Sequence, residues 1–152
     1  MSRLVTGTVV ENTAGAEYEG VVYDRRLIIR LADGRQIDVF DPGPPIGDPL
    51  TPGTPAELAL VAAVPTGVGV DGAGEPDRNW HGEVVDTAWR AAPDTLEVLR
   101  PNLTEHPWVV VDTPIGGLLL SPDDLPEGMR EAASVSWDGS RLDLFGFTRT
   151  AP

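Results

Sequence analysis

The sequence lacks cysteine and lysine altogether. The absence of cysteine from its 152 residues excludes disulfide bonds, thiolate catalysis and cysteine-ligated zinc. All 11 basic residues are arginine. The chain therefore cannot form a lysine Schiff base or supply the lysine of a phosphate-binding P-loop. These two absences exclude several large classes of enzyme.

Long apolar runs are also missing. The two longest, Leu58–Val64 and Ile115–Leu120, fall far short of the ~20 residues that a helix needs to cross a bilayer. Residues Met1–Gly7 contain no apolar stretch of the kind that a signal peptide needs. We therefore expect a cytoplasmic protein that does not contact a membrane.

Basic charge is scarce. The chain has 24 acidic residues against 11 basic ones, for a formal net charge of −13, and the acidic residues are spread along its whole length. Nucleic-acid binding requires clustered cations, so the overall charge argues against a nucleic-acid partner. Solubility alone accounts for an acidic surface, and a partner with a basic surface is the alternative explanation.

Glycine and proline, by contrast, are frequent, with 17 and 15 residues. They mark turns between short runs of valine, isoleucine and leucine, and hydrophobic residues make up 41% of the chain. This pattern is typical of an all-β protein with many short strands. We predict short antiparallel strands in one or two small barrels or sandwiches, with at most one or two short helical turns.

A turn at Gly34 joins two apolar segments, 27–31 and 35–39. A two-residue loop would mix polar and apolar side chains on both faces of the resulting hairpin. A three-residue loop over 32–34 gives one entirely apolar face, in which Leu27 pairs with Val39 and Ile29 with Ile37. Burial of one clean face sets the register of a strand pair, so we predict the longer loop, with Gly34 in the left-handed conformation.

A second hairpin is predicted around Asp138-Gly139. A two-residue turn there would place four apolar side chains on one face: Val135, Trp137, Leu142 and Leu144. Phe145 and Phe147 would then lie on the opposite face. Either a bulge near Gly146 turns them inward, or a partner or a second copy of the chain covers them. They are therefore candidate interface residues of a homo-oligomer or a complex.

Other segments give less regular patterns. Residues 108–111 and 118–120 are continuously apolar, which predicts strands covered on both faces. Thr54–Glu57 is a capping box that favours a short helix over 54–64, whereas the internal repeat favours a strand, which we predict. Ser121–Asp124 has the pattern of a single helical or 3₁₀ turn.

The internal repeat is weak. Residues Gly7–Glu11 resemble Gly82–Asp86, which lie 75 positions later. Residues Leu27–Ile29 resemble Trp108–Val110, which follow in the same order. Chance similarity between valine-rich strands is the alternative explanation. A true repeat would mean two similar β units in one chain.

The repeat suggests a division of the chain into two β subdomains, residues 1–66 and 82–150. A glycine-rich acidic linker over 67–81 would join them, and one compact domain over 1–150 is the alternative. The succession of strands and loops resembles small OB-like or SH3-like barrels. This likeness is one of architecture and implies no function.

Candidate catalytic residues are few. On a strand, His81 and Glu83 would share a face and could act as acid and base, with Asp112 as a third candidate. The only other histidine is His106, and two histidines cannot make a three-histidine zinc site, so we assign no metal. Residues 67–72 match a dinucleotide-binding glycine pattern, but no helix follows them, so we expect no cofactor.

Arg25, Arg26 and Arg30 form the one local basic cluster. They lie beside Tyr18 and Tyr23, so they could hold a phosphate or a carboxylate. Arginine and aromatic residues together also suit single-stranded nucleic acid on a barrel face. These three arginines are the candidate ligand-binding residues.

The leading functional hypothesis is a non-catalytic protein-binding or adaptor module, acidic and cytoplasmic. One alternative is a small β-barrel that binds nucleic acid or a phosphorylated ligand through Arg25, Arg26 and Arg30. Another is a small hydrolase or metal-dependent enzyme that uses His81, Glu83 and Asp112.

Overall fold

The computed structural model describes residues 4–15, 17–42, 50–70, 80–92, 96–127, 129–139 and 141–150. Strands make up 64% of the described residues. The helical elements of the described ranges are two 3₁₀ turns, η1 (Pro101–Thr104) and η2 (Pro122–Asp124). The predicted all-β class is therefore confirmed. Within these ranges, no helix has the length and apolar character that crossing a membrane requires.

The strands follow one another closely along the chain. In order they are β1 (Val5–Ala14), β2 (Glu17–Tyr18), β3 (Val21–Val22), β4 (Asp24–Arg30), β5 (Gln36–Pro42), β6 (Pro55–Ala63), β7 (Thr66–Val70), β8 (Trp80–Trp89), β9 (Val98–Leu99), β10 (Trp108–Thr113), β11 (Gly116–Leu120), β12 (Ser134–Asp138) and β13 (Arg141–Arg149). All except β2 and β3 belong to one continuous sheet of 11 strands.

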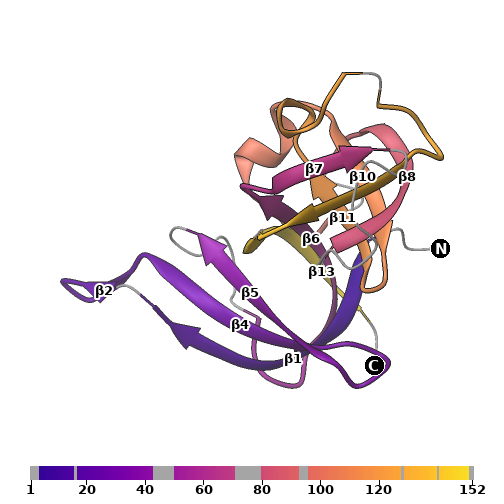
Figure 1. Cartoon of the computed structure of the whole chain (residues 1–152). Helices are drawn as coiled ribbons and strands as arrows, with labels where there is room; N and C mark the ends of the chain where they lie inside the picture. The colour runs from indigo at the N-terminus through magenta and orange to yellow at the C-terminus, as the bar shows by residue number, and fades with distance from the viewer. Residues whose placement is uncertain are drawn as a thin grey trace.

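Five of these strands close into a barrel (Figure 1). β1 pairs with β4, β4 with β5, β5 with β13, β13 with β6, and β6 again with β1. Every pairing is antiparallel except that of β5 with β13, where Phe40 lies beside Asp143 on a parallel strand. The order around the ring is therefore first, second, third, fifth and fourth strand. This is the Greek-key arrangement of an OB-like barrel.

A second set of strands repeats the pairing of the first four. β8 pairs with β10 and β12, and β10 with β11, as β1 pairs with β4 and β6, and β4 with β5. β1 and β8 are both ten residues long and begin 75 positions apart, at Val5 and Trp80. We call β1, β4, β5 and β6 the first unit, and β8, β10, β11 and β12 the second unit. Leu119 of β11 pairs with Val61 of β6, so the two units share one sheet.

Corresponding glycines lie where the first strand of each unit passes close to the second. A Cβ atom at Gly7 would lie 2.5 Å from Ile29 Cγ2 and 2.8 Å from the Arg30 carbonyl oxygen. A Cβ atom at Gly82 would lie 2.2 Å from the Asp112 carbonyl oxygen. Neither position has room for a side chain. This lack of space explains why both repeated segments contain a glycine.

The hairpin of β4 and β5 has the predicted register. Leu27 lies opposite Val39, and Ile29 opposite Ile37. Gly34 has a φ of +90°, in the left-handed region that a three-residue loop requires. The expectation that one clean apolar face sets the register is confirmed here.

The predicted hairpin around Asp138-Gly139 is wrong. In the described residues β12 pairs with β7 and β8, while β13 pairs with β5, β6 and β9, and the two are not paired with each other. The four apolar side chains nevertheless enter one core: Val135, Trp137, Leu142 and Leu144. An alternating strand can bury its apolar face beside any neighbour. Alternation therefore indicates the faces of a strand but not its partners.

Residues 108–111 of β10 and 118–120 of β11 are buried on both sides of the sheet, as predicted. One face contributes to the main core through Val109, Val111, Leu118 and Leu120. The opposite face contributes to a second core through Trp108, Val110 and Leu119. Residues 55–63 form strand β6, which confirms the strand prediction over the helical one. Ser121 caps η2 by accepting a hydrogen bond from the Asp123 N–H, as its pattern predicted.

A β-bulge in β13 places the two phenylalanines. The pairing of β13 with β6 shifts by one residue between Leu144 and Gly146. Phe147 is thereby buried in the main core, and Phe145 packs against the second core, edge-on to Trp108 with 6.0 Å between ring centroids. Of the two alternatives given for Phe145 and Phe147, the structure shows the bulge near Gly146. Phe145 and Phe147 do not form an exposed apolar patch.

Strand pairing connects the two halves of the chain. β13 completes the barrel of the first unit, and β7 pairs with β12 of the second unit. Residues 67–70, expected in a linker, are therefore strand, and residues 71–79 of that expected linker lie outside the described residues. The division into subdomains at residues 66 and 82 stays a prediction.

Candidate functional site

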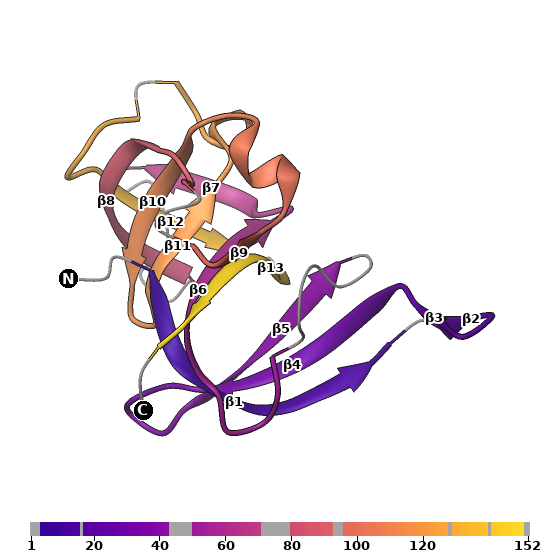
Figure 2. The same cartoon turned by 180° about the vertical axis from the view of Figure 1, so that it is seen from behind.

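A short hairpin extends from the outer end of the first unit. It consists of β2 and β3, which lie in the connection between β1 and β4. Its turn residues, Glu19 and Gly20, have φ of +51° and +79°, as a type I′ turn requires. Tyr18 lies opposite Val21 across this turn. Figure 2 shows the hairpin standing away from the rest of the molecule.

Large apolar side chains are exposed on this hairpin and directly after it. Tyr18 is 66% exposed, Val21 48% and Tyr23 45%. In the described ranges, the only other large hydrophobic residue that is exposed is Val64, at 77%. We call Tyr18, Val21 and Tyr23 the hairpin patch.

Carboxylates border the hairpin patch. Glu17 and Glu19 are exposed on the hairpin itself, and Asp24 follows Tyr23 at the start of β4. Neither Glu17 nor Glu19 forms an ion pair with another residue of the described chain. The patch is therefore an apolar centre with an acidic border.

A hollow of about 350 Å³ lies at the base of the hairpin, between β4, β5 and the start of β13. It is lined by Gly15, Asp24, Arg25, Arg26, Asp38, Val39, Phe40 and Arg141. Two of its arginines are already paired. Arg26 Nη2 lies 2.7 Å from an Asp38 oxygen. Arg141 holds both oxygens of Asp143 at 2.6 and 3.0 Å, a bond that raises the pKa of Arg141.

Arg25, the third arginine of this hollow, belongs to a polar cluster at the end of the barrel. Its Nη1 donates to Asn12 Oδ1 at 3.2 Å, and its Nε is buried without a hydrogen-bond partner. Opposite Arg25, Asp41 forms an ion pair with Arg100. Burial raises the pKa of Asp41, and the nearby Arg100 and Arg25 guanidiniums oppose that rise. These contacts make the Arg25 side chain part of the polar packing at the end of the barrel.

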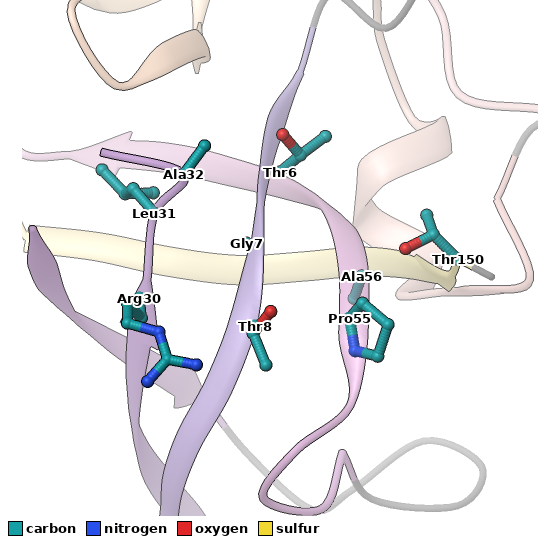
Figure 3. A pocket seen from close by; sticks show the side chains of 9 residues that line it. All are labelled: Thr6, Gly7, Thr8, Arg30, Leu31, Ala32, Pro55, Ala56 and Thr150. Carbon is teal, nitrogen blue, oxygen red and sulfur yellow. The ribbon is translucent and has the colours of Figure 1, made fainter. Parts of the chain in front are cut away.

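The third arginine of the predicted basic cluster, Arg30, lies elsewhere. It lines a separate hollow of about 360 Å³ on the outer face of β1, β4 and β6, together with Thr6, Thr8 and Thr150 (Figure 3). The structure thus brings Arg25 and Arg26 to one hollow and Arg30 to another.

Two of the candidate catalytic residues lie side by side. Glu83 of β8 pairs with Asp112 of β10, and His81 lies two residues before Glu83, opposite Ser136 of β12. Glu83, Asp112 and His81 are exposed, and none of them lines either hollow. The described residues include no group of three or more histidines and carboxylates arranged to hold a metal ion.

The remaining histidine lies away from His81. His106 precedes β10, and its ring lies against Trp108, with 4.3 Å between centroids. Trp108 pairs with Trp89 at the end of β8 opposite to His81. The structure therefore does not bring the two histidines together.

Sequence reasoning missed Val21, Phe40 and Arg141. The signal for Val21 was present, since Glu19-Gly20 is a two-residue turn between β-prone residues. Phe40 and Arg141 meet only through the parallel pairing of β5 with β13, where the Arg141 guanidinium lies 4.2 Å from the centre of the Phe40 ring. Searches against models of protein families, curated proteins and solved structures gave no match to this chain.

Proposed function

We propose that this chain is a non-catalytic protein-binding module that holds its partner on the hairpin patch. The observation that carries the proposal is the concentration of exposed apolar surface. Tyr18, Val21 and Tyr23 lie within six residues and account for three of the four exposed large hydrophobic residues in the part of the chain that the structure describes. Tyrosine is enriched at the centres of protein interfaces, because it offers apolar area together with a polar hydroxyl.

The position of the patch supports this proposal. In OB-like barrels the first connection and the face of the second and third strands form a common binding surface, which in known cases takes oligonucleotides and oligosaccharides. Here those elements are the connection that contains β2 and β3, and the strands β4 and β5. A hairpin with a two-residue turn also loses little conformational entropy on binding, because its backbone is already ordered.

Charge indicates the chemistry of the partner. The acidic border of Glu17 and Glu19 and the net charge of −13 favour a partner with basic residues around an apolar pocket. Opposite charge at the rim would accelerate association and make it sensitive to salt.

The alternative of a nucleic-acid ligand has less support. Arg26 and Arg141 are paired with carboxylates, and Arg25 is held by Asn12 at the end of the barrel. A phosphate at this hollow would have to compete with those acidic partners. The enzyme hypothesis based on His81, Glu83 and Asp112 stays a prediction.

The test is capture of a partner from source cells, with the whole chain immobilised and the complex cross-linked. We expect a protein that binds the wild type, and whose recovery falls about tenfold or more with the double variant Tyr18→Ser/Tyr23→Ser. Val64→Ser is the control, because it removes an apolar side chain elsewhere that is even more exposed than the two tyrosines. Recovery should also fall with Glu17→Gln/Glu19→Gln and with increasing salt.

Equal recovery by the wild type and the tyrosine double variant would overturn the proposal. So would equal losses in the double variant and in Val64→Ser, because the loss would then not be specific to the hairpin. Far-ultraviolet circular dichroism of each variant checks that the fold is retained.

A further inference from the structure

A second surface of the molecule has a different chemistry. The hollow around Arg30 is on the outer side of β1, β4 and β6 (Figure 3). None of the residues that line it is acidic, although the chain has 24 acidic residues. Its volume of about 360 Å³ accommodates a small organic ligand.

Arg30 differs from most other arginines of the described chain in having no partner for its guanidinium. Most of the others donate to a side-chain oxygen: Arg25 to Asn12, Arg26 to Asp38, Arg35 to Asp33, Arg100 to Asp41, Arg141 to Asp143 and Arg149 to Glu97. Arg130 also interacts with another group. Within the described residues, Arg30 and Arg90 alone remain without such a bond, and only Arg30 lines a hollow.

Three threonines line the same hollow as Arg30. Thr8 lies directly opposite Arg30 in the register of β1 with β4, so the two side chains share one face. Thr6 lies two residues before Thr8 and therefore on the same face. Thr150 is at the far rim, where its N–H donates to the Pro55 carbonyl at 3.0 Å. Figure 3 shows Arg30 and Thr8 side by side.

The close passage of β1 beside β4 keeps this arrangement in place. Gly7 allows it, since a Cβ atom there would lie 2.8 Å from the Arg30 carbonyl oxygen. The nearest carboxylate by register is that of Glu57, which pairs with Thr6 but does not line the hollow.

We propose that this hollow binds the phosphate group of a small phosphomonoester. A free guanidinium presents two parallel N–H donors that match two oxygens of one phosphate. Threonine hydroxyls donate to the remaining oxygens. The hollow is larger than a phosphate ion requires, so the ester carries an organic group such as a sugar. This inference is independent of the hairpin patch, which lies at the other end of β4.

The experiment is a titration of the ¹⁵N-labelled chain, followed by amide chemical shifts at constant ionic strength. The two probes are inorganic phosphate and ribose 5-phosphate. We expect saturable shifts at Thr6, Thr8, Leu31 and Ala56, and tighter binding of the sugar phosphate. Arg30→Gln should weaken binding about tenfold or more, because it removes a charge-assisted bond. Tighter binding of inorganic phosphate than of the ester would contradict the assigned ligand class.

Arg90→Gln is the matched control, since Arg90 is the other unpaired arginine of the described chain and should leave the affinity unchanged. Thr8→Val, which suits a strand, should weaken binding without loss of fold. Shifts that do not saturate up to roughly 20 mM of either probe would overturn the proposal. Equal effects of Arg30→Gln and Arg90→Gln would overturn it too, because binding would then follow overall charge.

Discussion

The two units have the same strand pairing but very different first connections. In the first unit, residues 15–23 link β1 to β4 and include the exposed hairpin of β2 and β3. In the second unit, residues 90–107 link β8 to β10 and include β9 and η1. Their side chains Leu96 and Leu103 are buried in the second core.

The difference shows that the connection between the first two strands of a unit determines whether the outer face of its sheet is buried or exposed. In the second unit the connection covers that face, and the Trp108 Nε1–H donates to the Leu103 carbonyl at 2.9 Å. In the first unit no described segment covers β4 in this way, and Arg26 and Arg30 are exposed there. The same pairing thus supports a buried core in one place and an exposed face in the other.

Truncation of a side chain in each connection tests this contrast most strongly. Leu103→Ala should lower the free energy of unfolding by about 2–5 kcal/mol, because it leaves a cavity in the second core. Tyr18→Ala should change it by no more than about 0.5 kcal/mol, because Tyr18 is exposed. Urea unfolding measures both. Similar losses in the two variants would show that the hairpin is packed in solution and would break the comparison.

The two glycines of the repeat provide a second contrast. Gly82→Ala should cost about 1–3 kcal/mol in the free energy of unfolding, because its new methyl group would meet the Asp112 backbone. Gly7→Ala should cost less, because the nearest backbone atom to its new methyl group, the Arg30 carbonyl oxygen, lies at 2.8 Å, against 2.2 Å for the Asp112 carbonyl oxygen at Gly82. Thermal or urea unfolding of the two variants ranks them. A larger loss in Gly7→Ala would mean that the first unit is the tighter of the two.

The smallest effect concerns pH at an ion pair between β5 of the first unit and the connection of the second unit. Asp41 of the first unit is paired with Arg100, which follows β9. Burial raises the pKa of Asp41 above its ordinary value of 3.8, so the folded chain binds that proton more tightly than the unfolded chain does. This contribution to stability is present below pH 3.8 and is lost as the pH rises through the folded-state pKa.

Asp41→Asn should remove that loss from a series of urea unfolding curves recorded at increasing pH. Asp33→Asn is a control of opposite sign, because a hydrogen bond from the Arg35 N–H lowers the pKa of Asp33. Its contribution is present above pH 3.8 and disappears as the pH falls. An unchanged pH profile in Asp41→Asn would contradict this, because it would show that the pKa of Asp41 is the same in the folded and unfolded chains and that Arg100 and Arg25 fully offset burial.

Local features of this fold could be predicted from the sequence because they depend on neighbours in the chain. The register of the β4–β5 hairpin follows from one apolar face and one glycine, Gly34. The Ser121 cap follows from three consecutive residues. Two-sided burial of 108–111 follows from its lack of alternation.

Long-range pairing could not be predicted in the same way. The apolar face of residues 134–138 can be buried equally well beside β13 or beside β7 and β8. No feature of the local sequence distinguishes these partners. The bulge at Phe145 was foreseen only as an alternative, because it depends on how β13 pairs with β6.

Only part of the candidate site was visible in the sequence. Tyr18 and Tyr23 were noted as neighbours of the arginines, but their exposure depends on a connection that folds away from the sheet. The three arginines were expected together. Arg30 is instead the last residue of β4, four residues after Arg26, and lines another hollow.

The closing strand of the barrel has a consequence for the order of events during synthesis. β13 pairs with β5 and β6, yet the whole second unit is translated between β6 and β13. The first four strands therefore emerge with the edges of β5 and β6 unpaired, and these edges wait for a strand that arrives last. Open strand edges attract other chains, so this interval is when aggregation or capture by a chaperone competes most directly with folding.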